Sequence, residues 1–227
     1  MIPPLGAWGL TGTPVPLPGG HRNTVLRVGD HVVKSTRRSE AAIAWLLPVL
    51  DAAEQAGLRA PRPLRSASGA LVVDGWTCEA CLPGAPTDPT SIAAQMAAFH
   101  SLTQSQPQRP GFASAGALVM AHRGGDIDLT AMPPPLVARL RAAWAMLPND
   151  QTVVHGDLSR GNLLTGADGG VTLVDWDEAR VDHPGFDLAQ LGQHDPIQAR
   201  AAYAWEIACC WQIEPDRARA LAQVFAE

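Results

Sequence analysis

The sequence predicts an α+β fold in which a small antiparallel sheet with one main helix precedes a mostly helical region. Three observations predict it. Short β-prone runs joined by turn residues fill the first part of the chain, apolar residues recur at helical spacing after Pro83-Gly84, and one further hairpin interrupts the helices. We therefore place a boundary between two domains at Leu82-Pro83, which gives the domains 1–82 and 83–227.

The first domain opens on a predicted hairpin. Thr24–Val28 and His31–Lys34 are β-prone runs, and Gly29-Asp30 between them is a common two-residue hairpin turn. Two more β-prone runs, at 63–67 and 71–81, follow the helix described next. Together these runs predict about four antiparallel strands.

One helix is predicted inside this group of strands. Ser39 is a good N-cap for a helix that begins at Glu40 and carries apolar residues on one face. Pro48 should break or restart this helix, and Gly57 should end it.

The second domain is predicted to be helical, with one hairpin. Apolar residues at helical spacing predict helices near 92–102, 136–147, 198–210 and 216–225. The hairpin joins Asn162–Thr165 to Val171–Asp175 across a glycine-rich turn.

Composition limits the class of protein. The chain has 227 residues, of which 46% are hydrophobic and 17% charged, as expected for one or two globular domains. A net charge of −5 argues against a nucleic acid or an anionic membrane as the main partner. Lysine and arginine together number 17, and Lys34 is the only lysine, which marks that position for a chemical role.

Cellular location and cysteine use are predicted from similar observations. The first residues lack the basic start and apolar stretch of a targeting segment, and the longest apolar run, 41–50, is too short to span a bilayer. We expect a cytoplasmic protein in which the four cysteines are free thiols. Cys78-x-x-Cys81 has no second pair at zinc-ligand spacing.

The residues that carry chemistry surround the predicted hairpin of the second domain. A β-prone pair leads His155 and Asp157 into a tight turn, Asn162 opens the hairpin, and its return strand presents Asp175 beside Asn162. An amide oxygen next to a carboxylate suits Mg²⁺. Asp157 is a second carboxylate near this pair, and it can accept a proton from an attacking hydroxyl. The pattern therefore predicts phosphoryl transfer.

These residues resemble a known family. His155-Gly156-Asp157 with Asn162, followed by Asp175-Trp176-Asp177, is similar to the motifs of the aminoglycoside phosphotransferase and choline kinase family. The resemblance covers nearly the whole chain. It implies a two-lobed protein-kinase-like fold, with a nucleotide-binding N-lobe and a C-lobe that holds the catalytic loop, the metal site and the substrate pocket. It also implies ATP and Mg²⁺ as cofactors and a hydroxyl-bearing small molecule as the phosphate acceptor.

The resemblance also implies roles for residues of the second domain. Asp157 would be the catalytic base, and His155 would order the loop around it. Asn162 and Asp175 would be metal ligands. Asp187 would support the catalytic loop from below.

A second set of residues would bind the nucleotide. Lys34 is placed like the family's phosphate-binding lysine, and Glu40 like the helix carboxylate that pairs with it. The backbone near Glu79 to Cys81 would lie against the adenine. The nucleotide-binding residues implied in this way are Gly20, Asn23, Lys34, Glu40, Glu79 and Cys81.

Three other functions compete with this one. A protein kinase is disfavoured because Gly156 stands where such kinases have an arginine and no A-P-E segment follows Asp175. A serine hydrolase is disfavoured because Asp157 precedes Ser159 where the nucleophile elbow needs glycine. A non-catalytic nucleotide-binding regulatory module of the same fold remains open, although every predicted catalytic position is filled.

Overall fold

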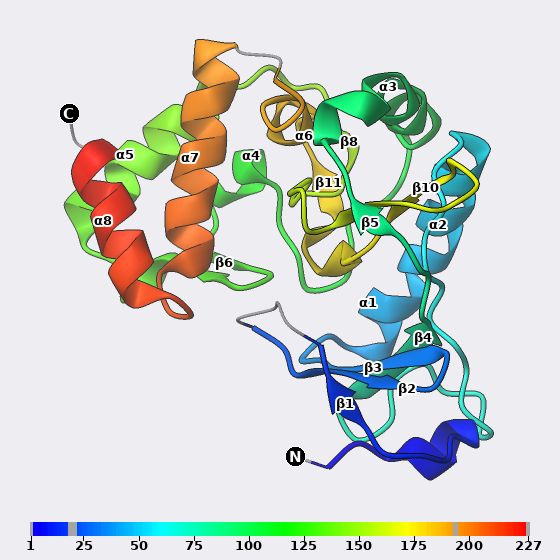
Figure 1. Cartoon of the computed structure of the whole chain (residues 1–227). Coiled ribbons are helices and arrows are strands. Elements are labelled where there is room, and N and C mark those ends of the chain that lie inside the picture. The colour runs from blue at the N-terminus through cyan, green and yellow to red at the C-terminus, as the bar shows by residue number, and fades with distance from the viewer. Residues whose placement is uncertain (1, 18–21, 193–194, 226–227) are drawn as a thin grey trace. The chain divides into compact units, whose positions relative to one another are not determined.

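The structure is a computed structural model that describes residues 2–17, 22–192 and 195–225. The chain forms two compact units (Figure 1). Unit 1 consists of Met1–Asp88 and Arg160–Val174, and unit 2 consists of Pro89–Ser159 and Asp175–Glu227. The domain boundary at Leu82-Pro83 stays a prediction, and the contacts place the later hairpin in unit 1 rather than in unit 2.

Unit 1 contains a four-stranded antiparallel sheet in the order β1-β2-β3-β4. Its strands are β1 (Val15–Pro16), β2 (Val25–Val28), β3 (His31–Ser35) and β4 (Trp76–Ala80). The predicted hairpin is present as β2 and β3, and Gly29 between them has a φ of 58°, which glycine adopts without strain. One face of the sheet is buried through Val28, Val33, Trp76 and Cys78.

One prediction for this sheet is wrong, and one strand was not predicted. The run 63–67 forms no strand, and only an isolated bridge joins Pro63 to Glu79. The short strand β1 takes the fourth place instead, next to a 3-10 helix, η1 (Leu5–Trp8), that the sequence pattern did not reveal. Pro63, at the start of the run 63–67, has no N–H to donate to a neighbouring strand, and β1 has only two residues, one of them Pro16, which are too few to show alternation.

The helix of unit 1 is divided into α1 (Glu40–Ala44) and α2 (Leu46–Gln55). The Ser39 hydroxyl accepts a hydrogen bond from the Ala42 N–H at 3.2 Å, which confirms the predicted cap. The division falls at Trp45, three residues before Pro48, because a proline cannot donate to the preceding turn. Gly57 follows the helix with a φ of 85°.

The predicted later hairpin forms a second sheet of unit 1. Its strands are β5 (Ala85–Pro86), β9 (Leu163–Thr165) and β10 (Val171–Leu173), in the order β10-β9-β5. The backbone of Arg59 extends this sheet, because its N–H donates to the Val171 oxygen and its oxygen accepts from the Leu173 N–H, both at 2.8 Å. An exposed ion pair also joins Arg59 to Asp168 in the hairpin turn.

Unit 2 is mostly helical. Its helices are η2 (Pro89–Ile92), α3 (Ala93–Leu102), α4 (Ala115–Leu118), η3 (Leu129–Ala131), α5 (Pro134–Ala145), η4 (Trp176–Glu178), α6 (Gly185–Leu188), α7 (Pro196–Cys210) and α8 (Pro215–Phe225). Two antiparallel pairs complete it: β6 (Arg123–Gly124) with β7 (Ile127–Asp128), and β8 (Thr152–Val154) with β11 (Arg180–Asp182). Figure 1 shows α7 beside α8, which it contacts.

The core of unit 2 lies between α5 and α7, where Leu140, Trp144 and Trp205 are buried. Trp144 and Trp205 contact each other with ring centroids 6.1 Å apart. The four predicted helices are present. In α3 the predicted apolar face holds except at Leu102, which is 48% exposed at the end of the helix.

No helix among the described residues is both long and apolar enough to cross a membrane. The cytoplasmic location inferred from the sequence stays a prediction.

Candidate active site

The catalytic-loop motif follows β8 directly. His155 is fully buried, and Gly156 has a φ of 85°, a left-handed conformation that disfavours side chains. A Cβ on Gly156 would also lie 2.8 Å from Arg180 Nη1 and 3.1 Å from the Glu178 oxygen. Only glycine fits at this turn, which leads the chain out of the core to the partly exposed Asp157.

The fully buried carboxylate of Asp187 holds this loop. It accepts hydrogen bonds from the N–H groups of His155 and Gly156, both at 2.9 Å. It also bonds to the Nε2 atom of His100 at 2.9 Å. The Asp187 carboxylate thus accepts hydrogen bonds from α3 and from the loop. We infer that these bonds fix the direction of the backbone at Asp157, the next residue of the loop.

The charge state of Asp187 follows from this environment. Burial alone would raise its pKa, but the hydrogen bonds and charge of His100 and the N–H of Gly156 outweigh burial and hold the pKa below its ordinary value. Asp187 is therefore a carboxylate in the folded protein, and its charge stabilises the fold.

We expect Asp187→Asn to destabilise unit 2 by roughly 2–4 kcal/mol at neutral pH, because an amide has one oxygen and cannot accept from three donors. The folded pKa lies below the unfolded one, so this contribution is present above about pH 4 and is lost as the pH falls through the folded pKa. Urea midpoints at pH 7 and pH 3 measure the difference, with Asp216→Asn as a fully exposed control. A difference between wild type and variant that does not shrink in acid contradicts the assignment.

His155 contacts the loop through its own ring. Its Nδ1 atom accepts a hydrogen bond from the Asp157 N–H at 3.3 Å, so a neutral ring carries its proton on Nε2. The ring also meets the edge of Trp176, with centroids 4.8 Å apart, and Trp176 meets Phe99 at 5.6 Å. These contacts pack the His155 ring against Trp176, and the ordering role of His155 stays a prediction.

Asp175 has an unusual backbone conformation. Its φ is 62° and its ψ 63°, and among the described residues only Asp74 shares a positive φ without being glycine. Such strain persists only where the surroundings enforce it, and it gathers at functional sites. Asp175 stands directly before the η4 turn, with its side chain partly exposed.

Asn162 is positioned from the other arm of the hairpin. Its backbone oxygen accepts a hydrogen bond from the Val174 N–H at 2.9 Å, so it lies opposite the residue that precedes Asp175. Asn162 and Asp175 supply an amide oxygen and a carboxylate, and both residues are partly exposed. Oxygen donors of these two kinds are the ones that a hard divalent cation such as Mg²⁺ prefers, and the role of the two residues as metal ligands stays a prediction.

The residues predicted to bind phosphate lie in unit 1. Lys34 occupies β3 opposite Val25 and Thr77, and its neighbour Val33 is fully buried, so Lys34 projects from the opposite face of the sheet. The carboxylate of Glu40 accepts hydrogen bonds from the N–H groups of Leu71 and Val72, at 2.8 to 3.1 Å. These hydrogen bonds join the start of α1 to the segment before β4. The pairing of Glu40 with Lys34 stays a prediction.

The other predicted nucleotide-binding residues also lie in unit 1. Glu79 on β4 pairs with Val32 on β3, and the Cys81 N–H donates to the Asp30 oxygen at 2.8 Å. Asn23 is partly buried in the bend before β2. Gly20 lies outside the described residues. The roles of all four in nucleotide binding stay predictions.

The cysteines do not pair with one another. All four are free, and burial, with a contribution from Glu79, raises the pKa of Cys78 to about 11. A thiol with so high a pKa is protonated and unreactive at neutral pH.

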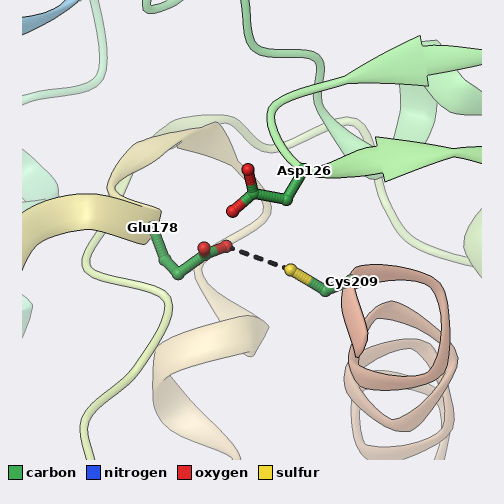
Figure 2. Close-up of side chains that lie close together, drawn as sticks. All are labelled: Asp126, Glu178 and Cys209. Carbon is green, nitrogen blue, oxygen red and sulfur yellow. Dashed lines mark hydrogen bonds between the residues drawn. The ribbon is translucent and has the colours of Figure 1, made fainter. Parts of the chain in front are cut away.

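One group of side chains was not predicted from the sequence. Asp126, Glu178 and Cys209 have ligand atoms within 4.8 Å of one another, and the Cys209 thiol donates to Glu178 at 3.3 Å (Figure 2). The Cβ of Glu178 lies 3.2 Å from where a Cβ on Gly156 would stand, so the group borders the catalytic loop. The three residues are far apart in sequence and share no motif, so no local signal could have found them.

A model of the phosphotransferase enzyme family matches residues 13–221. The chain belongs to this family.

Solved structures show the same α+β, protein-kinase-like fold. An amicoumacin kinase in complex with AMP-PNP, Ca²⁺ and Ami matches with a TM-score of 0.70 and 14% identity, over 98% of this chain and 90% of that one. A microcompartment-associated aminopropanol kinase matches with a TM-score of 0.61 and 14% identity, over 98% and 92%. A macrolide 2′-phosphotransferase from Brachybacterium faecium matches with a TM-score of 0.54 and 19% identity, over 96% and 94%. No curated protein matches the chain by sequence.

Proposed function

We propose that the protein is an ATP-dependent phosphotransferase that moves the γ-phosphate of ATP to a hydroxyl of a small molecule. Membership of the phosphotransferase enzyme family supports the reaction class. The observation that carries the assignment is the anchoring of the loop, in which Asp187 binds the N–H groups of His155 and Gly156 directly before Asp157. These hydrogen bonds restrain the two residues that precede Asp157, which supports a role for the Asp157 carboxylate in the reaction.

In the proposed reaction Asp157 accepts the proton of the acceptor hydroxyl as its oxygen attacks the γ-phosphorus of ATP. The bond between that phosphorus and the β,γ-bridging oxygen breaks, and ADP leaves with the electron pair. The hydrogen bond from the Asp157 N–H to His155 restrains the base, which saves entropy in the transition state.

Asn162 and Asp175 are the residues that would hold Mg²⁺. Bound Mg²⁺ would neutralise phosphate oxygens and so lower the barrier to transfer. Lys34 would bind phosphate oxygens, with Glu40 beside it, and the backbone from Glu79 to Cys81 would face the adenine. Gly20 and Asn23 would complete the nucleotide site.

The carboxylates beside the loop favour one kind of acceptor. Asp126 and Glu178 are both partly buried, and Glu178 adjoins Gly156, which precedes the proposed base. Two neighbouring carboxylates attract a cation. An acceptor that carries an amino group besides its hydroxyl would therefore bind better than one without.

A screen of ATP consumption tests the function. Hydroxyl-bearing compounds are offered with Mg²⁺ and ATP, in pairs that differ only by an amino group. We expect phosphorylation of at least one acceptor, detected by mass spectrometry, and a preference for the amino-bearing member of its pair. Binding of Mg·ATP without turnover of any acceptor would favour the alternative, a non-catalytic nucleotide-binding regulatory module of the same fold.

The single lysine offers a sharp prediction. We expect Lys34→Arg to lower kcat/KM for ATP by about 10²-fold, because the guanidinium is wider than the ammonium and misplaces the phosphates. The charge is kept, so folding should be nearly normal. Arg27→Lys, at an exposed position of β2, is the matched control.

Chemical labelling checks Lys34 independently. An ATP-derived acyl phosphate should acylate one side chain, since the sequence has one lysine, and excess ATP should block the reaction. Labelling that ATP does not affect, or a fully active Lys34→Arg enzyme, removes Lys34 from the site.

A further inference from the structure

The loop between α3 and α4 contains a buried arginine that binds the turn after Asp175. Arg109 is 1% exposed. Its Nη1 atom donates to three backbone oxygens, those of Trp176 at 3.1 Å, Asp177 at 3.0 Å and Ala179 at 3.0 Å. These carbonyls all belong to the η4 turn or to the residue after it, so a single cation draws the whole turn together.

The segments on both sides of this contact are also joined. The Gln108 side chain donates to the Val181 oxygen at 2.8 Å and accepts from the Val181 N–H at 3.0 Å, as a neighbouring strand would. Its oxygen also accepts from the Arg109 N–H at 2.8 Å. The guanidinium of Arg109 lies over the Phe112 ring, 4.6 Å from its centroid. Arg109 is therefore held through its backbone N–H by Gln108 and through its guanidinium by the three carbonyls and the Phe112 ring.

The turn that Arg109 binds begins at a strained residue. Asp175 has a left-handed backbone, which costs free energy and persists only where the surrounding chain enforces it. The hairpin holds the preceding side, through the hydrogen bond from the Val174 N–H to Asn162. On the following side Arg109 binds the first two carbonyls after Asp175, those of Trp176 and Asp177, and also that of Ala179. Without that donor the turn could relax and rotate the carboxylate.

We propose that Arg109 is a positioning residue for metal binding, which holds the η4 turn so that Asp175 presents its carboxylate to Mg²⁺. The inference rests on the proposed function, in which Asp175 is a metal ligand. Arg109 acts through the backbone and touches neither substrate nor metal. Partners of this kind, one step removed from the ion, commonly affect metal affinity strongly.

Arg109→Lys tests the proposal. The charge is kept, but the ammonium is one bond shorter and cannot stack on Phe112 as the planar guanidinium does. Phe112→Leu is a milder second variant that removes the ring beneath the guanidinium. Arg141→Lys is the matched control, because Arg141 also donates to two backbone oxygens of unit 2, those of Leu118 at 3.1 Å and Ala121 at 2.8 Å.

Two readouts that need no turnover are compared. Mn²⁺ binding to the complex with AMP-PNP, followed by the electron paramagnetic resonance of free Mn²⁺, should weaken about 10- to 100-fold in Arg109→Lys and less in Phe112→Leu. Hydrogen exchange of a peptide covering 175–181 should become faster in the same order. Arg141→Lys should match the wild type in both.

Each result decides the proposal. Faster exchange with unchanged Mn²⁺ affinity overturns it and leaves Arg109 a structural residue only. Unchanged exchange, or an equal loss of Mn²⁺ affinity in Arg141→Lys, overturns it as well. A wild-type protein that binds no Mn²⁺ with AMP-PNP contradicts the proposed function itself, and this is seen before any variant is compared.

Discussion

Asp157→Asn is expected to lower kcat by about 10²–10⁴-fold while leaving the affinity for Mg·ATP nearly unchanged. The amide keeps the size of the side chain but cannot take the proton of the acceptor hydroxyl. The N–H of residue 157 that bonds to His155 is still present in the variant, so the loop should keep its shape. Steady-state kinetics with a saturating acceptor, together with calorimetric titration of nucleotide, separate the two quantities.

Asp150→Asn provides the control, because Asp150 is exposed in the segment before β8 and has no predicted role in the reaction. It should match the wild type in both measurements. Full turnover in Asp157→Asn would remove Asp157 from the mechanism. A matching loss of nucleotide affinity would point to a role in binding instead.

Asp175→Ala is expected to abolish metal-dependent binding of nucleotide and, with it, phosphoryl transfer. Substitution of a residue that contacts a metal ligand commonly lowers metal affinity about 10- to 100-fold, so loss of a direct ligand should lower it more than about 100-fold. Alanine also tolerates the left-handed backbone of this position less well than aspartate does. Asp175→Asn, which keeps an oxygen and tolerates that backbone, should retain more binding than Asp175→Ala.

The neighbouring carboxylate of Asp177, two residues along the same turn, is the control for this experiment. Asp177→Asn should keep most of the metal-dependent affinity, measured as AMP-PNP binding with and without Mg²⁺. Undiminished phosphoryl transfer in excess chelator would contradict the role assigned to Asp175. So would equal losses in the two variants.

Local patterns predicted much of the fold. The hairpin turn at Gly29-Asp30, the cap at Ser39 and the four predicted helices of unit 2 each depend on residues close together in sequence, and each is present. The strand β1 could not be found this way, since two residues are too few to show alternation. The order of strands around β5 depends on contacts between distant segments, which no local period encodes.

The residues of the candidate site also differ in whether the sequence alone could reveal them. His155, Asp157 and Asn162 share one short motif, so their spacing is visible in the sequence. Arg109 is one arginine among many, and only the fold shows that it meets carbonyls 67 to 70 residues away. The pairing of Glu40 with Lys34 comes from resemblance alone and stays a prediction, whereas the hydrogen bonds from the backbone of Leu71 and Val72 to the Glu40 carboxylate are visible only in the fold.

The division of unit 1 into two stretches of chain affects how the protein can be made. The backbone partners of Arg59 and the partner strand of β5 both lie in Arg160–Val174. During synthesis the ribosome must release all of Pro89–Ser159 before those partners emerge. Unit 1 therefore cannot finish folding before most of unit 2 is synthesised, because its last segment follows Pro89–Ser159 in the chain. A nascent chain arrested before Arg160 carries β5 and Arg59 without their backbone partners, so their N–H and C=O groups can pair with another chain.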